Sequence, residues 1–362
     1  MYSPFRYISS LFWKRRPIHL TFFVTRRCNS RCPFCFYLRS DDVPSGALPE
    51  LSLSEIGKIS SSLGRLLWLS FSGGEIFLRD DLVEIARTFY RNNKPAIMLF
   101  PTNGFLPGVI RERIEAIVRS CPRSVVALKL SLDGLGEAHD ALRKTPGSFT
   151  RTMQTYQAVS GMTDRYPNFE LGINTVFCSE NQDAMDEIID YVGGLKYVRT
   201  HTISLVRGNL SDKSYAGVDI NKYHDAVLKL ERNLQEGRSA VYRFRGGRIK
   251  AAQDILQRRL IDRTAREHRR IVPCYAARLN LVLSEAGEVY PCELLTDSFG
   301  NVRDHGYDIQ KVGGSKKARG VIASIRNDRC HCTHECYFMT NILFNPRLYP
   351  SLMKEYLLLR PK

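Results

Sequence analysis

An α/β fold built on a parallel sheet is predicted by three features of this 362-residue sequence. Short apolar or β-branched runs recur between residues 19 and 210, each run ends in turn residues, and amphipathic stretches separate the runs. Strands that alternate with helices pair in parallel, in a sheet that is either open or curled into a barrel. In such folds the functional residues lie at the carboxyl ends of the strands.

Six strand–helix units are expected in this region. The predicted strands are HLTFFVT (19–25), LLWLSFSG (66–73), AIMLFPTNG (96–104), VVALKLSLDG (125–134), FELGINTVF (169–177) and YVRTHTISLV (197–206). The predicted helices, in which apolar residues recur every three or four positions, cover 52–63, 80–90, 107–120, 148–159 and 181–192.

The pattern changes after residue 210. Two polar helices, at about 221–236 and 249–266, precede the alternating run RLNLVLSEAGEVYPCE, which predicts a hairpin around Gly287. A cysteine-rich loop follows. We therefore divide the chain into a basic amphipathic segment (1–18), a barrel-like domain (19–210), a helical connection (211–268), a cysteine-rich domain (269–346) and a C-terminal tail or helix (347–362).

Composition limits the classes of function. The chain has 43% hydrophobic residues and no apolar run long enough to span a membrane, so we expect a cytoplasmic protein. A net charge of +16 predicts an anionic partner, but the basic residues are scattered, and nucleic acid is not expected. Phe5, Ile8 and Phe12 have helical spacing and precede three basic residues. This segment predicts either peripheral contact with the inner face of the membrane or a short helix packed on the protein body.

Three of the ten cysteines lie in TRRCNSRCPFCF, directly after the first predicted strand. Cys28, Cys32 and Cys35 are one thiolate short of a closed zinc site. The neighbouring Phe34 and Phe36 would exclude water, which suits an iron–sulfur cluster. Three thiolates on a four-iron cluster leave one iron open to another ligand.

This CxxxCxxC spacing, with an aromatic residue before the third cysteine and a repeated β/α chain around it, resembles the radical S-adenosylmethionine (SAM) superfamily. The resemblance implies a partial (β/α)6 TIM-like barrel and a 4Fe-4S cluster whose open iron binds the amine and carboxylate of SAM. It also implies reductive cleavage of SAM to a 5′-deoxyadenosyl radical, which abstracts a substrate hydrogen atom. An electron donor such as flavodoxin or ferredoxin is then expected.

Other strand ends carry motifs of this family. Ser72-Gly73-Gly74-Glu75 is similar to its GGE motif, and Thr102-Asn103-Gly104 and Ser131-Leu132-Asp133-Gly134 follow the next strands. The resemblance implies a cofactor-binding set of Phe34, Gly73, Gly74, Glu75, Thr102, Asn103, Ser131, Asp133, Asn174 and Arg207. Taken singly, Ser131 and Thr102 are also ordinary caps or turn formers, Asp133-Gly134 an ordinary turn, and Glu75 an ordinary acid before a helix.

A second cysteine group contains Cys274, Cys292, Cys330, Cys332 and Cys336. The first two bracket the predicted hairpin, which resembles the auxiliary-cluster extension called SPASM or its shorter relative, twitch. Five cysteines favour the twitch type, with a second 4Fe-4S cluster on Cys274, Cys292, Cys332 and Cys336, and with Cys330 as the alternative to Cys332. A closed cluster of this kind would accept or relay an electron. His331 and His334 keep zinc open as the alternative.

The sequence leaves two classes of substrate open. A sugar, an aminocyclitol or another small or lipid-linked molecule is favoured, and a ribosomal peptide is the alternative. Cys178, on the same face of its strand as Asn174, is a candidate hydrogen donor, whereas Cys121 is expected to be a buried apolar residue. The rival from another class is a non-catalytic zinc protein that binds an acidic partner.

Overall fold

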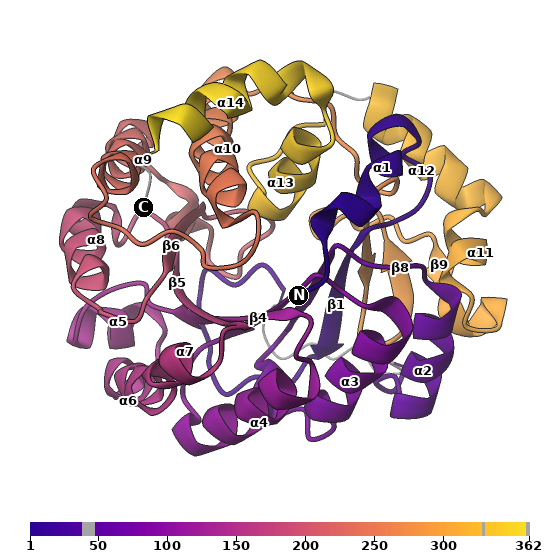
Figure 1. Ribbon diagram of the computed structural model, residues 1–362, viewed down its shortest axis with the longest axis horizontal. Coiled ribbons are helices and arrows are strands. Elements are labelled where there is room, and N and C mark those ends of the chain that lie inside the picture. Colours follow the sequence, from indigo (N-terminus) through magenta and orange to yellow (C-terminus); the bar gives the residue numbers. More distant parts are fainter. Residues whose placement is uncertain (38–47, 328–329, 360–362) are drawn as a thin grey trace.

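The computed structural model describes residues 1–37, 48–327 and 330–359. Its nine strands form one sheet in the order β6-β5-β4-β3-β2-β1-β7-β8-β9 (Figure 1). The six strands predicted from the sequence are all present and pair in parallel with their neighbours in chain order. They are β1 (His19–Thr25), β2 (Trp68–Gly73), β3 (Ile97–Thr102), β4 (Val125–Ser131), β5 (Phe169–Phe177) and β6 (Thr200–Leu205).

Helices cover the outer face of the curled sheet (Figure 1). The predicted helices correspond to α2 (Leu53–Ser62), α3 (Leu82–Asn93), α4 (Pro107–Ser120), α6 (Ser148–Ser160) and α8 (Met185–Gly193). Two short helices, α5 (Glu137–Leu142) and α7 (Met162–Arg165), lie between them in the chain. Local sequence explains where α2 begins: Ser52 and Glu55 form a capping box at its first turn.

Alternation along the strands separates the core from the interior cavity. In β2, Leu69 and Phe71 are fully buried, and Phe71 stacks on Phe100 of β3 with ring centroids 4.7 Å apart. Ser70 and Ser72, which alternate with them, line a cavity inside the sheet. Because side chains of successive residues point to opposite faces, the polar residues of neighbouring strands meet inside this cavity. The chain is therefore a partial (β/α)6 barrel.

The sheet continues beyond β1 with strands from the C-terminal region. β7 (Asn280–Leu283) pairs in parallel with β1, with Phe22 opposite Leu283, and β8 (Glu288–Tyr290) pairs antiparallel with β7. The predicted hairpin is thus confirmed, but its addition to the edge of the barrel sheet was not predicted. β9 (Gly300–Asn301) completes the sheet.

Helices from the C-terminal half lie over the side of the barrel that β6 and β7 leave open. α10 (Gly247–Glu267) and α13 (Glu335–Leu343) contribute Lys250, Arg258 and Met339 to the cavity lining. The remaining helices are α9 (Ile220–Gln235), α11 (Ile309–Gly313), α12 (Lys316–Asn327) and α14 (Tyr349–Leu358). The N-terminal segment contains a 3-10 turn, η1 (Pro4–Tyr7), followed by the short helix α1 (Ser9–Phe12). Further 3-10 turns are η2 (Ile76–Leu78), η3 (Gln182–Ala184), η4 (Lys213–Ala216), η5 (Val302–His305) and η6 (Pro346–Leu348). Residues 360–362 of the predicted C-terminal segment lie outside the described residues, and the domain limits stay predictions.

Within the described part of the chain, no helix has both the length and the apolar character that crossing a bilayer requires.

Candidate active site

The first cysteine group lies in the loop that follows β1. Burial, together with the nearby charges of Glu75, Cys32 and Cys35, raises the pKa of the Cys28 thiol to about 11. The Cys32 sulfur lies 3.1 Å from the Ser30 hydroxyl, and the Cys35 amide donates to the Cys32 carbonyl at 3.1 Å. The three thiols therefore lie within electrostatic reach of one another. A metal centre there would favour their thiolate forms, so the donor set fits a three-thiolate cluster site.

Gly73 and Gly74, at the end of β2, have no side chain, and this lets the backbone before the cysteine loop pack closely against them. A Cβ on Gly74 would lie 2.1 Å from the Arg27 carbonyl oxygen, and one on Gly73, whose φ is +124°, would lie 2.3 Å from that of Thr25. The chain leading into the cysteine loop is thus packed directly on the Gly-Gly segment. The glycines admit the backbone that carries the cysteines, and their place in the cofactor-binding set stays a prediction.

Glu75 is 2% exposed and is held by the protein itself. Its carboxylate accepts hydrogen bonds from the Thr102 hydroxyl (2.8 Å) and from the backbone amides of Asn103 (2.8 Å) and Phe77 (3.1 Å). The Asn103 side chain in turn donates to Asn29 of the cysteine loop at 2.7 Å. Glu75, Thr102 and Asn103 therefore form one polar network around the thiols. Whether they also contact SAM stays a prediction.

Asp133 lies at the end of β4 but is turned away from the cavity. One carboxylate oxygen accepts two hydrogen bonds from Arg143, at 2.6 and 2.8 Å, and the other accepts from the Val176 amide at 2.8 Å. Asp133 is completely buried and Arg143 is 6% exposed. The pair links β4, β5 and α5 beside Cys32, whose pKa the Arg143 charge lowers against the larger opposing effect of burial.

Ser131 is the last residue of β4, Asn174 lies three residues before the end of β5, and Arg207 lies two residues after β6. Ser131 is opposite Asn174 in the β4–β5 register, and the Asn174 side-chain oxygen lies 3.4 Å from the Ser204 hydroxyl. Asn174, Ser204 and Arg207 line the interior cavity, whose volume is about 260 Å³. Arg207 donates to Glu335 of α13 at 2.9 Å. In this structure Arg207 thus pairs with a carboxylate of the protein itself, that of Glu335.

Lys129 lies deeper in the same cavity. Its ammonium donates to the hydroxyls of Thr200 and Thr202 on β6. Burial lowers its pKa to about 7, against the opposing charge of Asp254. Of the alternate residues Lys129, Ser131 and Asp133, only Lys129 lines the cavity, and β4 has ended before Asp133.

Phe34 and Cys178 pack together behind the cysteine loop. They are 7% and 0% exposed and form a small apolar cluster with Leu142, against which Cys32 packs. The Cys178 sulfur lies 3.5 Å from the Asn181 side-chain oxygen, and burial raises the pKa of the thiol to about 11. Cys178 is not part of the cavity lining. Its role as a hydrogen donor stays a prediction. Cys121 is also fully buried.

The second cysteine group gathers around the hairpin and the start of α13. Burial raises the pKa values of Cys274, Cys292 and Cys332, and neighbouring thiols add to each rise: Cys330 for Cys274, Cys332 and Cys274 for Cys292, and Cys274 and Cys330 for Cys332. Four thiols of this group thus lie close together. All ten cysteines of the chain are described, and none forms a disulfide.

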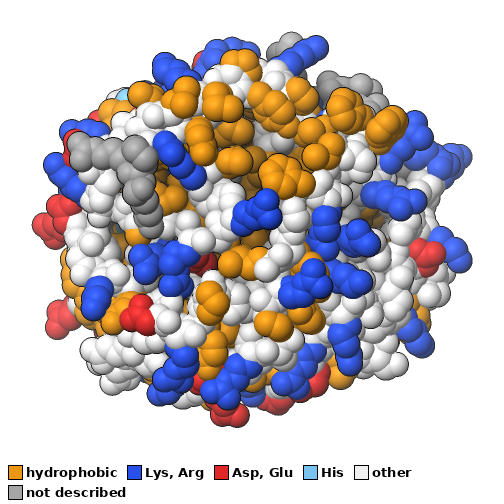
Figure 2. Space-filling model, in the orientation of Figure 1, with side chains coloured by type: hydrophobic (Ala, Val, Ile, Leu, Met, Phe, Trp, Pro, Cys, Tyr) orange, Lys and Arg blue, Asp and Glu red, His pale blue; other side chains and the backbone are white. Residues whose placement is uncertain are grey.

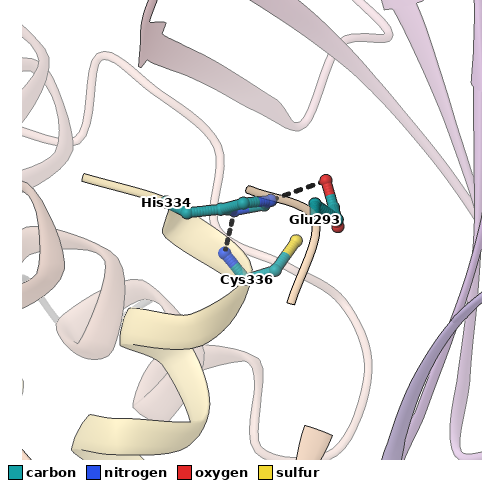
Figure 3. Close-up of side chains that lie close together, drawn as sticks. All are labelled: Glu293, His334 and Cys336. Carbon is teal, nitrogen blue, oxygen red and sulfur yellow. Dashed lines mark hydrogen bonds and ion pairs between the residues drawn. The ribbon is translucent and has the colours of Figure 1, made fainter. Parts of the chain in front are cut away.

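Cys336, the fifth thiol of this group, lies at the wall of the interior cavity. Its sulfur forms a compact group with Glu293 and His334, with ligand atoms within 4.8 Å of one another (Figure 3). His334 Nε2 lies 2.7 Å from a Glu293 oxygen, and its Nδ1 accepts from the Cys336 amide at 3.3 Å. This group has a donor set that zinc also accepts.

Several of these residues were missed by the sequence prediction. Arg143, Glu293 and Glu335 are ordinary charged residues in the sequence, and their partners are far away in the chain or on other elements. The Asp133–Arg143 pair carried a weak sequence signal, because its two residues are only ten positions apart, on either side of the short helix α5. Lys129 was not among the site residues predicted from the sequence.

Comparisons with known proteins agree with this geometry. Residues 22–192 match the family described as the Radical SAM superfamily. The AdoMet-dependent heme synthase of Methanosarcina barkeri is 27% identical over 78% of this chain and 78% of its own length. The subtilosin biosynthesis protein AlbA of Bacillus subtilis is 26% identical over 81% of this chain, and the match spans 59% of AlbA.

Solved structures resemble the fold. anSMEcpe with bound AdoMet superposes with a TM-score of 0.60 and 17% identity, covering 94% of this chain and 95% of that one. Streptococcus suis SuiB bound to S-adenosylmethionine gives a TM-score of 0.59 and 14% identity, covering 86% and 68%. Both likenesses extend well beyond the six barrel strands into the C-terminal region. Residues 22–192 of this chain thus form a domain of the Radical SAM superfamily.

Proposed function

We propose that this enzyme binds a 4Fe-4S cluster on Cys28, Cys32 and Cys35, cleaves SAM reductively and abstracts a hydrogen atom from an organic substrate in the interior cavity. The observation that carries the proposal is the placement of three thiols in one loop at the carboxyl end of β1, whose leading backbone packs on Gly73 and Gly74 beside the buried Glu75. When bound, the cluster and SAM supply a one-electron reduction and a carbon radical able to take hydrogen from an unactivated C–H bond.

The surrounding residues would orient the cosubstrate and exclude water. Phe34 and Leu142 form an apolar wall behind Cys32, and the Asp133–Arg143 pair adds a fixed positive charge near the thiols. Ser131, Asn174 and Arg207 are proposed to contact SAM or the substrate from the ends of β4, β5 and β6. A dry, preorganised site of this kind limits side reactions of a radical.

A second 4Fe-4S cluster is proposed in the C-terminal region, in a twitch- or SPASM-like arrangement. Cys274, Cys292, Cys332 and Cys336 are the proposed ligands, with Cys330 as the alternative. The electrostatic proximity of Cys274, Cys292, Cys330 and Cys332 supports a shared centre and strengthens the case for Cys330. Such a cluster would accept an electron from the substrate or relay one, as an oxidoreductase requires.

The substrate class is proposed from the cavity. Its polar side chains, among them Lys129, Asn174 and the Arg207–Glu335 pair, can bind hydroxyl, amine or carboxylate groups. A volume of about 260 Å³ suits the reacting part of a sugar, an aminocyclitol or a lipid-linked molecule. The relatives are named for unlike molecules, including heme, a bacteriocin and GTP, so their names do not favour one substrate class.

Modification of a ribosomal peptide is the second candidate. AlbA, a bacteriocin biosynthesis protein, matches 81% of the residues of this chain, and this similarity favours the peptide alternative. A peptide would have to present a single side chain to the cavity, because the lining residues of α10 and α13 close its side.

Anaerobic purification tests the proposal. We expect a brown protein with about eight iron atoms per chain, which releases 5′-deoxyadenosine from SAM after reduction by dithionite. A colourless protein that contains zinc at a stoichiometric level and releases no 5′-deoxyadenosine would instead identify a zinc-binding protein. Release that increases on addition of a candidate sugar, lipid or peptide would identify the substrate class.

A further inference from the structure

Two apolar stripes remain exposed on one face of the molecule. In the N-terminal segment, Phe5, Ile8 and Phe12 are 59%, 52% and 71% exposed, at the spacing of one helical face. On α14, Tyr349, Met353 and Leu357, each four residues apart, are 36%, 56% and 70% exposed. An ordinary surface helix carries polar residues at such positions.

Both segments are nevertheless firmly attached to the protein by their other faces. Tyr7 is 4% exposed, packs with Ile18 and Leu67, and donates its hydroxyl proton to the Leu66 carbonyl. Leu359, just after α14, is 1% exposed, and its carbonyl accepts from Arg248 of α10 at 2.7 Å. The outward stripes are therefore a second apolar surface on elements whose core-facing side is already satisfied.

An apolar groove joins the two stripes. It has a volume of about 830 Å³, and its lining includes Phe5 and Ile8 of the N-terminal segment, Tyr349 and Tyr356 of α14, and residues 244–250 at the start of α10. Figure 2 shows hydrophobic side chains gathered on this face, over the region where Figure 1 draws α1, α10 and α14. A continuous patch of this kind marks an interaction surface.

The charges around the groove are of one sign. Arg15, Arg16, Arg245 and Lys354 are exposed near the apolar stripes. Residues 1–18 contain no Asp or Glu, and Glu355, the one acid of residues 349–359, is buried and lies 2.6 Å from Arg259. A basic rim complements an anionic surface and opposes a second copy of the same face.

We propose that this face docks on a bilayer that contains anionic phospholipids. Phe12 and Trp13, whose rings are 5.8 Å apart and which are 71% and 66% exposed, enter the interfacial region, where aromatic rings are favoured. The basic rim binds the lipid phosphates, and the groove contacts the acyl chains. Docking is independent of the reaction proposed above.

Cosedimentation of the full chain with vesicles tests this proposal. We expect binding to phosphatidylcholine vesicles that contain phosphatidylglycerol, and binding at least about tenfold weaker to pure phosphatidylcholine or in 1 M salt. Phe12→Ser with Trp13→Ser, and separately Arg15→Glu with Arg16→Glu, should each weaken binding at least about tenfold.

Matched controls keep the result specific. Leu228→Ser removes an exposed apolar residue of α9, and Arg111→Glu with Lys213→Glu reverses two exposed charges outside the groove; both should bind like the unmodified chain. All variants should release 5′-deoxyadenosine in lipid-free buffer at the same rate. Failure of the unmodified chain to cosediment, equal binding to pure phosphatidylcholine, or equal loss in the controls would each overturn the proposal. A lipid-free dimer that Phe12→Ser with Trp13→Ser dissociates, without vesicle binding, would assign the face to a second copy.

Discussion

Cys28, Cys32 and Cys35 lie in a single loop after β1. The five C-terminal cysteines come instead from the segment before β7, from the loop after β8, and from the first turn of α13 and the chain leading into it. The first group is held by neighbours at adjacent strand ends, including Gly74 and Asn103. The second depends on the docking of segments up to sixty residues apart. Sequence spacing can therefore specify the first ligand set, but it cannot specify the second.

Removal of one thiol from each group gives the sharpest test of this contrast. We expect Cys32→Ser to reduce 5′-deoxyadenosine release by at least about a thousandfold, because radical formation needs that cluster. Cys292→Ser should remove about four iron atoms per chain and abolish substrate turnover while SAM cleavage persists. Iron analysis and product quantification measure both effects.

Cys121→Ala is the matched control, since that thiol is buried in the core away from both groups. It should keep all of its iron. Comparison of Cys330→Ser, Cys332→Ser and Cys336→Ser by iron content would identify the remaining ligands. Loss of SAM cleavage in Cys292→Ser equal to that in Cys32→Ser would mean that the two groups do not function separately.

The next largest effect is expected at the buried pair beside the first group. Arg143→Gln leaves the Asp133 carboxylate buried without its cation, at 0% exposure, and should lower the free energy of unfolding by about 3–5 kcal/mol. Anaerobic denaturant titration measures this change. Asp133→Asn in the same chain should recover part of the loss. A change in Arg143→Gln below about 1 kcal/mol would show that the pair behaves like a surface ion pair.

A pH-dependent effect is expected where the C-terminal region joins the barrel. Glu55 of α2 accepts from Arg303 of η5 at 2.7 Å, and this bond holds the pKa of Glu55 at about 2. Because that pKa lies below the ordinary value of 4.5, the stabilisation is complete above pH 4.5 and is lost as the pH falls towards 2.

Glu55→Gln removes the charge and keeps a side chain able to complete the capping box. At pH 7 it should lower the free energy of unfolding by roughly 1.5–3 kcal/mol. Thermal unfolding of Glu55→Gln and of the unmodified chain should be compared between pH 7 and pH 3. The difference between their free energies of unfolding should become smaller below pH 4.5. A difference that does not depend on pH would exclude this ion pair as its source.

The smallest effect distinguishes two glycines. Gly74→Ala forces a Cβ against the Arg27 carbonyl, 2.1 Å away, and should cost about 1–3 kcal/mol and weaken iron retention by the first group. Gly57→Ala, in α2 with no atom within 4 Å of the new methyl group, should stabilise the chain by about 0.5–1 kcal/mol. Denaturant midpoints and iron content compare the two. Equal iron retention would mean that the cysteine loop tolerates the shift.

The sequence predicted the barrel strands closely because their period-two patterns and turn residues are local. It also identified the polar residues at the strand ends. It did not show that Asp133 is bound by Arg143, that Arg207 is bound by Glu335, or that β7 pairs with β1, because each depends on contacts between distant segments. For the same reason the choice between Cys330 and Cys332 stays open, and the pattern of Phe5, Ile8 and Phe12 did not show which side of the N-terminal segment faces outward.

The parallel pairing of β1 with β7 also fixes the distance over which an electron would travel between the two proposed clusters. The first cysteine loop follows β1, and Cys292 follows β8, which pairs with β7. The hydrogen bonds between β1 and β7 therefore position both cysteine groups relative to each other. A register slip of one residue would shift one centre by about 3.3 Å and reverse the faces of the strand. Because electron tunnelling rates fall steeply with distance, the β1–β7 register would also set the rate of electron transfer between the two proposed clusters.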